Sequence, residues 1–298
     1  MRHWLRLIDV ISTRTSLPVG HQVARLLSII MRWSSPIYCG YLIQNISIVF
    51  SEKSKKCIKH IMINSQKKYF EFFSTYSWLS TCQLDSATKM LDRISICGLS
   101  NLRECEQSGR PVVVVSIHMG DFLLGFLKLA SSINLKQGVG VIKWMAQSKK
   151  EDLAYKKFND LGIDLSIFRL TSNPAIQILR FLRKGNIILT LCDISHHFVK
   201  TTQVSFFNRS AQFSCGPAEL AIASGALVLP MVSVRKNGVE TLIIEPLIDS
   251  RKVLKNGVSI HENATYLTQL IASFVESWIQ DYPDQWHLWG VLGDLWDN

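Results

Sequence analysis

The sequence is short of acidic residues. Its 298 residues include 23 aspartates and glutamates against 33 lysines and arginines, a formal net charge of +10, and 47% of the residues are hydrophobic. A basic, apolar chain of this kind suits contact with an acidic partner such as an anionic membrane surface or an acidic carrier. No DNA-binding or RNA-binding motif accompanies the charge, so we expect no nucleic-acid partner.

Closely spaced cysteine pairs are also missing. The seven cysteines are odd in number and scattered, and no two stand at the spacing of metal ligands. This pattern gives no disulfide framework and no zinc motif, so we expect reduced thiols that pack as small apolar residues. They are Cys39, Cys57, Cys82, Cys97, Cys105, Cys192 and Cys215.

The chain has no long uninterrupted apolar run. Its charged start, MRHWLR, leads into a short broken apolar stretch without a clear cleavage site, so we expect no cleavable signal peptide. The most apolar segment, 26–50, is interrupted by Arg32, Pro36 and Asn45, and a spanning helix needs about 20 apolar residues. The segment is therefore a poor candidate for crossing a membrane.

Two interpretations of segment 26–50 remain. One is a helical hairpin or interfacial segment, in which Trp33, Tyr38 and Tyr41 suit the headgroup zone. Nearby lysines would then meet anionic phosphates; they are Lys53, Lys55, Lys56 and Lys59. The other interpretation is a set of ordinary helices packed on the globular body.

Internal repeats and low-complexity linkers are absent as well. We expect a helical N-terminal region over 1–96 and an α/β domain over 97–298, with a mixed, mostly parallel central sheet flanked by helices. Strands are expected at 112–117, 138–143, 164–168, 187–191, 227–234 and 241–245, and helices at 146–161, 175–183, 217–224 and 262–280.

The most informative segment reads VVVVSIHMGDFLLGF. Val112 to Val115 predict a strand buried on both faces, which ends near His118. Gly120 allows a tight turn, and Asp121 is suited to cap the helix that follows. His118 then lies at the carboxyl end of a strand, where open α/β sheets bind their ligands. The alternative is a core histidine beside a structural cap.

Five segments, in order, resemble one family. They are NISIVF at 45–50, VVVVSIHMGDF at 112–122, the stretch 169–193 that ends in a strand and an aspartate, the stretch 204–232 and DYPDQWHLWG at 281–290. Together they resemble the bacterial lipid A biosynthesis acyltransferases, the lauroyl and myristoyl transferases within the wider lysophospholipid acyltransferase superfamily.

The resemblance implies transfer of a fatty acyl group to a hydroxyl of a lipid or glycolipid acceptor. The implied donor is a thioester of acyl carrier protein or coenzyme A, with no bound cofactor and no metal. The implied place is the cytoplasmic face of the bacterial inner membrane, with the protein peripheral or anchored by its N-terminus. An imidazole at His118 suits removal of the hydroxyl proton. The oxyanion that forms needs backbone N–H groups or a nearby cation.

Further residues are candidates for substrate binding. Arg169 is the candidate for contact with a phosphate or the oxyanion, or else a solvated surface arginine. Gly120 lies in the turn after the histidine. Asp193 follows a strand, where an α/β site places polar groups, or it caps a loop.

A turn and a helix start form another candidate region. Gly216 and Pro217 open a predicted helix, and Asn208 and Arg209 lie in the preceding turn. These four residues are expected to line the acceptor or carrier site, or to form a purely structural turn.

The chain departs from the family in one place. The family pattern is a histidine, four intervening residues and then an acid that orients the imidazole, but the fifth residue after His118 is Leu123. Asp121, in the first helical turn, is our candidate for the second catalytic residue. The alternatives are that Asp193 or Glu219 supports the imidazole of His118, or that no acid supports it.

Three hypotheses follow. We favour an acyltransferase with an unusual catalytic pair. The second is a non-catalytic relative that binds acyl chains or a carrier protein. The third is a metal-dependent hydrolase with His118, Asp121, Asp193, His196 and His197 as ligands, but adjacent histidines point in different directions and no ligand-spaced motif supports them.

Overall fold

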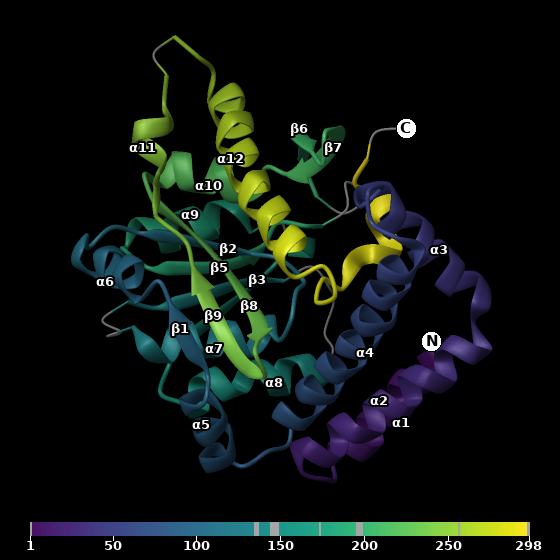
Figure 1. Ribbon diagram of the computed structural model, residues 1–298. Coiled ribbons are helices and arrows are strands. Elements are labelled where there is room, and N and C mark those ends of the chain that lie inside the picture. Colours follow the sequence, from purple (N-terminus) through teal and green to yellow (C-terminus); the bar gives the residue numbers. More distant parts are fainter. Residues whose placement is uncertain are drawn as a thin grey trace.

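The computed structural model describes residues 2–133, 137–143, 149–172, 174–194, 199–255 and 257–296. Their centre is a mixed sheet in which most neighbouring strands run parallel (Figure 1). From edge to edge its strands are β1 (Ser95–Cys97), β9 (Val239–Ile244), β8 (Leu227–Lys236), β2 (Val112–Ser116), β5 (Ile187–Leu191), β3 (Val139–Lys143) and β4 (Leu165–Arg169). The short β10 (Ile248–Asp249) pairs with β8. The predicted mixed, mostly parallel sheet flanked by helices is confirmed, and the membrane-associating role of the N-terminal region stays a prediction.

The valine run forms β2 in the middle of the sheet. β-Branched side chains suit a strand covered on both faces, and all five residues of β2 are buried. Val113 and Val115 enter the core on one face, and Val112 and Val114 enter the core on the other. The helices on the first face are α9 (Ala175–Arg183), α10 (Gly216–Ser224) and α12 (Ile260–Asp281), and those on the second are α5 (Leu84–Asp92), α6 (Leu99–Gln107), α7 (Phe122–Ser132) and α8 (Lys149–Asp160).

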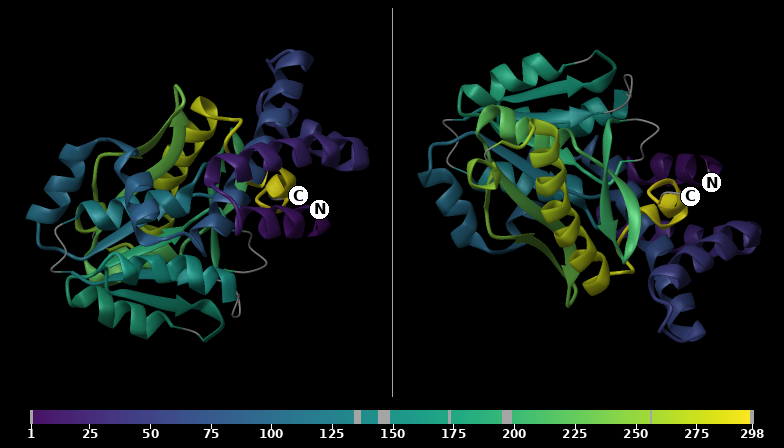
Figure 2. Two further views of the ribbon diagram at one scale, coloured as in Figure 1. Left: turned by 90° about the horizontal axis from the view of Figure 1, so that it is seen from below. Right: turned by 90° about the horizontal axis from the view of Figure 1, so that it is seen from above.

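Helices α1 (Arg2–Ser12), α2 (Leu17–Ser34), α3 (Pro36–Val49) and α4 (Lys55–Leu79) precede the sheet and lie on one side of the α/β body (Figure 2). Helix α2 ends before Pro36, because a proline disfavours helical backbone in the residue before it and then starts a new helix well. Among the described helices, none combines the length and apolarity needed to cross a membrane. The predicted boundary at residue 96 falls within β1, so the two-region division stays a prediction.

One hairpin is not predicted from the sequence. Strands β6 (Thr201–Phe206) and β7 (Arg209–Ser214) form a separate antiparallel pair. Their turn places Phe207 and Asn208 at positive φ, of 50° and 57°, without the glycine that usually marks such a turn. The remaining elements are α11 (Ser250–Val253) and the 3₁₀ helices η1 (Leu170–Ser172) and η2 (Leu288–Asp294).

A buried ionic cluster joins the N-terminal helices to the sheet. The Glu71 side chain on α4 is 3% exposed and accepts hydrogen bonds from Arg25 on α2 and from Arg235 on β8, the latter at 3.1 Å. Arg235 also pairs with Glu240 on β9. Burial would raise the pKa of Glu71, but Arg25, Lys68 and Arg235 hold it below its usual value. Glu71 is therefore a charged link between three elements.

We expect Glu71→Gln to lower the free energy of unfolding by about 2–3 kcal/mol, because Arg25 loses its carboxylate and the partly buried Arg235 keeps only Glu240. The matched control is Asp85→Asn, which breaks the exposed pair of Asp85 and Lys89 on α5. That change should cost at most about 0.5 kcal/mol. Urea unfolding of both variants measures the difference, and equal small losses would contradict the link.

Candidate functional site

The histidine lies at the carboxyl end of the central strand, as the sequence predicts. His118 stands two residues after β2, and Gly120 follows with a φ of +53°. A Cβ atom at Gly120 would lie 2.2 Å from the carbonyl oxygen of Ser233 on β8. Only glycine fits both this backbone conformation and this close approach, so the turn holds His118 at a fixed place.

The orienting acid comes from the neighbouring strand. Asp193 follows β5, which pairs in parallel with β2, and its Oδ1 lies 2.8 Å from Nδ1 of His118. Its Oδ2 accepts the backbone N–H of His118 at 2.9 Å. The carboxylate thus binds both the ring and the main chain of the same residue.

The two partners differ in exposure. The side chain of Asp193 is fully buried, while that of His118 is 31% exposed. A proton on Nδ1, donated to the carboxylate, leaves the lone pair on Nε2. Within the described part of the chain, no group hydrogen bonds to Nε2. The pair therefore presents a basic nitrogen supported from behind by a buried carboxylate.

Asp193 accepts a third hydrogen bond, from the indole Nε1–H of Trp286 to Oδ2 at 3.0 Å. Burial alone would raise the pKa of Asp193. The charge of His118 and the hydrogen bonds from His118 and Trp286 outweigh burial and hold the pKa of this carboxyl below its usual value. Asp193 is therefore ionised at neutral pH.

The C-terminal segment 285–287 pairs with the loop that carries the histidine. Gly120 donates its N–H to the carbonyl of Gln285 at 3.0 Å, and His287 donates its N–H to the carbonyl of His118 at 2.9 Å. The ring Nε2 of His287 lies 2.8 Å from the Gly120 carbonyl. Burial lowers the pKa of His287 to about 4, so its ring is neutral and Nε2 donates. The sequence of this segment resembles a family block, but nothing in it indicates a site role for Trp286 or His287.

The prediction that Asp121 orients the imidazole is wrong in this structure. Nδ1 of His118 is already bonded to Asp193, and Asp121 instead accepts a 3.4 Å hydrogen bond from Thr75 on α4. Burial, together with the charge of Glu240, raises the pKa of Asp121 well above its usual value. Leu123, which takes the place of the family acid, is 2% exposed and packs in the core. Here the first turn of α7 faces the protein interior.

An apolar cavity of about 590 Å³ lies between α9 and α10, on one face of the sheet. Thr190 and Ile194, which flank Asp193 in the sequence, line it, as do Gly216 and Pro217 at the start of α10. The predicted binding residues Gly216 and Pro217 are thus brought together with the segment that carries Asp193.

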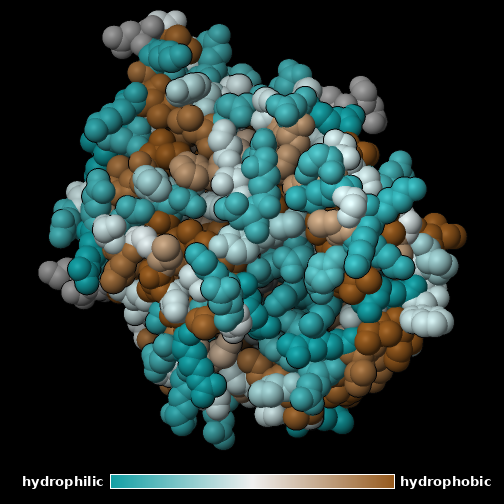
Figure 3. All heavy atoms as spheres, viewed as in Figure 1, coloured by the Kyte–Doolittle hydropathy of each residue, from teal (hydrophilic) through white to brown (hydrophobic). Residues whose placement is uncertain are grey.

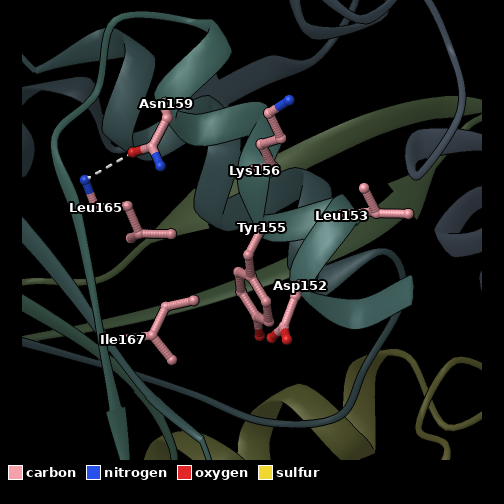
Figure 4. A pocket seen from close by; sticks show the side chains of 7 residues that line it. All are labelled: Asp152, Leu153, Tyr155, Lys156, Asn159, Leu165 and Ile167. Carbon is pink, nitrogen blue, oxygen red and sulfur yellow. Dashed lines mark hydrogen bonds between the residues drawn. The ribbon is translucent and has the colours of Figure 1, made fainter. Parts of the chain in front are cut away.

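Arg169 lies further from the histidine. It ends β4, directly beside Lys143 at the end of β3, and both cations lie 3.3 Å from Asp152 on α8. The close-up in Figure 4 shows Asp152 beside Tyr155. Both residues line a hollow of about 500 Å³ between α8 and the edge strand β4. The substrate contact predicted for Arg169 stays a prediction.

Asn208 lies in the turn between β6 and β7, and Arg209 is the first residue of β7. The guanidinium of Arg209 lies 4.4 Å from the ring centre of Trp296, and the N–H of Phe207 donates to Glu276 on α12. These contacts join the turn to α12 and to the C-terminal segment, and none involves His118. The binding roles predicted for Asn208 and Arg209 stay predictions.

The described residues contain no group of His, Cys, Asp and Glu side chains able to hold a metal ion. His196 and His197, which the hydrolase hypothesis used, lie outside the described residues.

Comparisons with known proteins give one consistent result. A phosphatidylinositol mannoside acyltransferase of Mycolicibacterium smegmatis is 21% identical over 201 residues, which cover 66% of this chain and 61% of that protein. The protein of the same name in Mycobacterium tuberculosis is 22% identical over 232 residues, 76% of this chain and 68% of its own. The match thus spans less than two thirds of the first relative and slightly more of the second.

The model of the family described as bacterial lipid A biosynthesis acyltransferase matches residues 4–290. This match runs through the histidine, the aspartate and the C-terminal segment that holds them, and it covers nearly the whole sequence. The chain belongs to the bacterial lipid A biosynthesis acyltransferase family.

Proposed function

We propose that the protein transfers a fatty acyl group from an acyl thioester to a hydroxyl of a lipid or glycolipid acceptor. The observation that carries this proposal is the pair of His118 and Asp193, with Nδ1 bonded to a buried carboxylate and the ring partly exposed. Family membership supports acyl transfer, and the glycolipid named in the mycobacterial relatives supports this class of acceptor.

The geometry of the pair of His118 and Asp193 supports the following course of acyl transfer. Nε2 of His118 takes the proton of the acceptor hydroxyl while the oxygen attacks the thioester carbonyl. The buried charge of Asp193 stabilises the imidazolium that forms. When the tetrahedral intermediate collapses, the C–S bond breaks and the imidazolium returns its proton to the thiolate. The products are the ester and a free thiol, and the imidazole is regenerated.

The alternative of a non-catalytic relative depended on a missing acid. Leu123 does stand where the family has an acid, but the carboxylate of Asp193 lies against Nδ1 of His118 and can orient the imidazole. This replacement favours an active enzyme.

The donor is an acyl thioester of acyl carrier protein or coenzyme A, both of which are anionic, and no bound cofactor takes part. Neighbouring strands lie about 4.8 Å apart, so Arg169, three strands from β2, is about 14 Å away at the level of the strand ends. That separation is too large for contact with the oxyanion. It suits an anionic group elsewhere on the donor or acceptor, beside Lys143.

The acyl chain fits the cavity between α9 and α10. Its lining is mainly apolar, and it begins beside Ile194, one residue after Asp193. From Gly216 at the strand-end level, α10 runs back along the sheet towards Ala223. An acyl chain that enters beside Asp193 therefore runs along α10 towards Ala223, which is exposed at the rim of the cavity.

The N-terminal helices supply the membrane contact, at the cytoplasmic face of the bacterial inner membrane. Trp33 at the end of α2 is 86% exposed, and Ile37 at the start of α3 is 89% exposed. Leu26, Ile29 and Ile30 of α2 are exposed as well. Figure 3 shows apolar side chains gathered over the N-terminal helices at the lower right. Exposed apolar surface of this kind marks a membrane or protein contact, and the net charge of +10 favours an anionic membrane.

Removal of either partner of the pair should abolish most transfer. We expect His118→Ala to lower kcat about a thousandfold and Asp193→Asn about a hundredfold or more, because the second leaves the imidazole in the wrong tautomer. Asp121→Asn, a matched loss of a buried carboxylate, should keep kcat near that of the wild type. Labelled acyl carrier protein and coenzyme A thioesters, offered with a panel of lipid and glycolipid acceptors, measure the rates. A loss in Asp121→Asn equal to that in Asp193→Asn would refute the assignment.

The cavity makes a prediction about chain length. Ala223 is exposed at the rim of the far end, and a phenylalanine in Ala223→Phe would cover that end, so the preferred acyl chain should become shorter by about two to four carbons, since each buried CH₂ contributes about 0.8 kcal/mol. Ile176→Phe, on the exposed face of α9, is the control and should leave the preference unchanged. Competition between thioesters of different length measures both variants, and an unchanged preference in Ala223→Phe would place the acyl chain elsewhere.

The double variant Trp33→Ser/Ile37→Ser should bind anionic vesicles at least about tenfold more weakly, since two apolar side chains lose their burial in lipid. Leu84→Ser/Leu99→Ser removes two exposed apolar side chains of α5 and α6 and should bind like the wild type. Sedimentation with phosphatidylglycerol vesicles measures both. Equal binding by the two variants would exclude this surface as the membrane contact.

A further inference from the structure

The indole of Trp286 contacts the acid of the pair directly. Nε1–H donates to Oδ2 of Asp193 at 3.0 Å, and the side chain of Trp286 has no exposed surface. Because Oδ2 is held by this bond and by the backbone N–H of His118, only Oδ1 faces the imidazole. Without the indole donor, the carboxylate has one fewer bond that fixes its plane.

The indole itself is held firmly by the sheet. The preceding residue, Gln285, is 4% exposed, and its side chain accepts from the backbone N–H of Arg235 and donates to the Arg235 carbonyl, at 2.8 and 3.0 Å. Trp286 also forms an antiparallel bridge with Met119, and its ring lies edge-on to Trp289. The donor is therefore fixed relative to β8 and to the loop of His118.

We infer that Trp286 is a positioning residue for acyl transfer: its indole N–H fixes the carboxylate of Asp193 against His118 and takes a share of its negative charge. The inference rests on the proposed function, in which His118 is the base. A hydrogen bond from a neutral donor makes a carboxylate a weaker proton attractor, so Trp286 limits how strongly the pair holds a proton on the imidazole.

Among the described residues, the other ionisable groups beside the pair do not titrate near neutral pH. His287, from the same C-terminal segment, has a pKa lowered to about 4 by burial. Burial and the charge of Asp193 raise the pKa of the Cys192 thiol well above its usual value. Phe122, which lies against the His118 ring, carries no charge. A shift of the pH profile near neutrality that occurs in Trp286→Phe and not in Trp289→Phe therefore reports the pair itself.

The test is Trp286→Phe, which keeps an aromatic ring and removes the N–H. We expect kcat to fall about 10- to 100-fold, the value of one hydrogen bond to a charged group, with KM within about threefold. The acidic limb of the pH profile of kcat should move to higher pH. Without the indole hydrogen bond, the carboxylate of Asp193 holds the proton on the imidazole more strongly. An unchanged limb, or a loss that appears only in KM, would overturn the inference.

Trp289→Phe is the matched control. Trp289 is equally buried and donates its Nε1–H to the carbonyl of Pro283 at 2.7 Å, without contact to Asp193. Its loss should lower stability but leave the pH limb in place. An equal shift in both variants would show that a general loosening of the C-terminal segment, and not the indole N–H, moves the limb.

Two further measurements distinguish a failure of this inference from a failure of the proposed function and from a failure of the variant to fold. ¹⁵N NMR titration of the His118 ring needs no substrate, so it tests the positioning role even if the wild type transfers no acyl group. The midpoint should rise in Trp286→Phe and not in Trp289→Phe, and an unmoved midpoint would refute the inference. If Trp286→Phe does not fold, benzothienylalanine at position 286 replaces the N–H by sulfur at nearly constant shape and should give the same shift.

Discussion

The site depends on one buried charge, the carboxylate of Asp193. An ionised group without exposure to water is costly unless hydrogen-bond donors surround it, and Asp193 has three: the ring and the main-chain N–H of His118, and the indole of Trp286. These donors come from the end of β2 and from the C-terminal segment. The need to satisfy one carboxylate therefore brings together three segments that are far apart in the sequence.

Much of the fold could be predicted from local pattern. The valine run of β2 and the apolar strands β5 and β8 are buried on both faces, and such runs carry their own signal. The β6–β7 hairpin was missed because its turn uses Phe207 and Asn208 at positive φ where glycine is the usual signal. The three-residue β1 was missed because its place depends on the distant partner β9. Short edge elements are defined by such partners more than by their own sequence.

The site was predictable to a smaller extent. His118 and Gly120 were found because a strand, a turn and a helix start occur in order within a few residues. Asp121 was chosen as the acid because it is near in sequence, but in a parallel sheet the carboxyl ends of adjacent strands also lie side by side, which places Asp193 against His118. Trp286 gave no local signal, since its contact with Asp193 spans 93 residues.

The acid that contacts His118 lies at the end of β5 and not on α7, and this position has a consequence for the proposed reaction. Ile194 and Thr190, which lie one residue after and three residues before Asp193, line the apolar cavity, so the segment that carries the acid also forms one wall of the proposed acyl site. An acyl chain in that cavity excludes water from the neighbourhood of the pair. Because electrostatic interactions strengthen as the local dielectric falls, the bound donor would itself increase the stabilisation that Asp193 gives to the imidazolium. An acid on α7, on the opposite face of the sheet, would not gain from the acyl chain in this way.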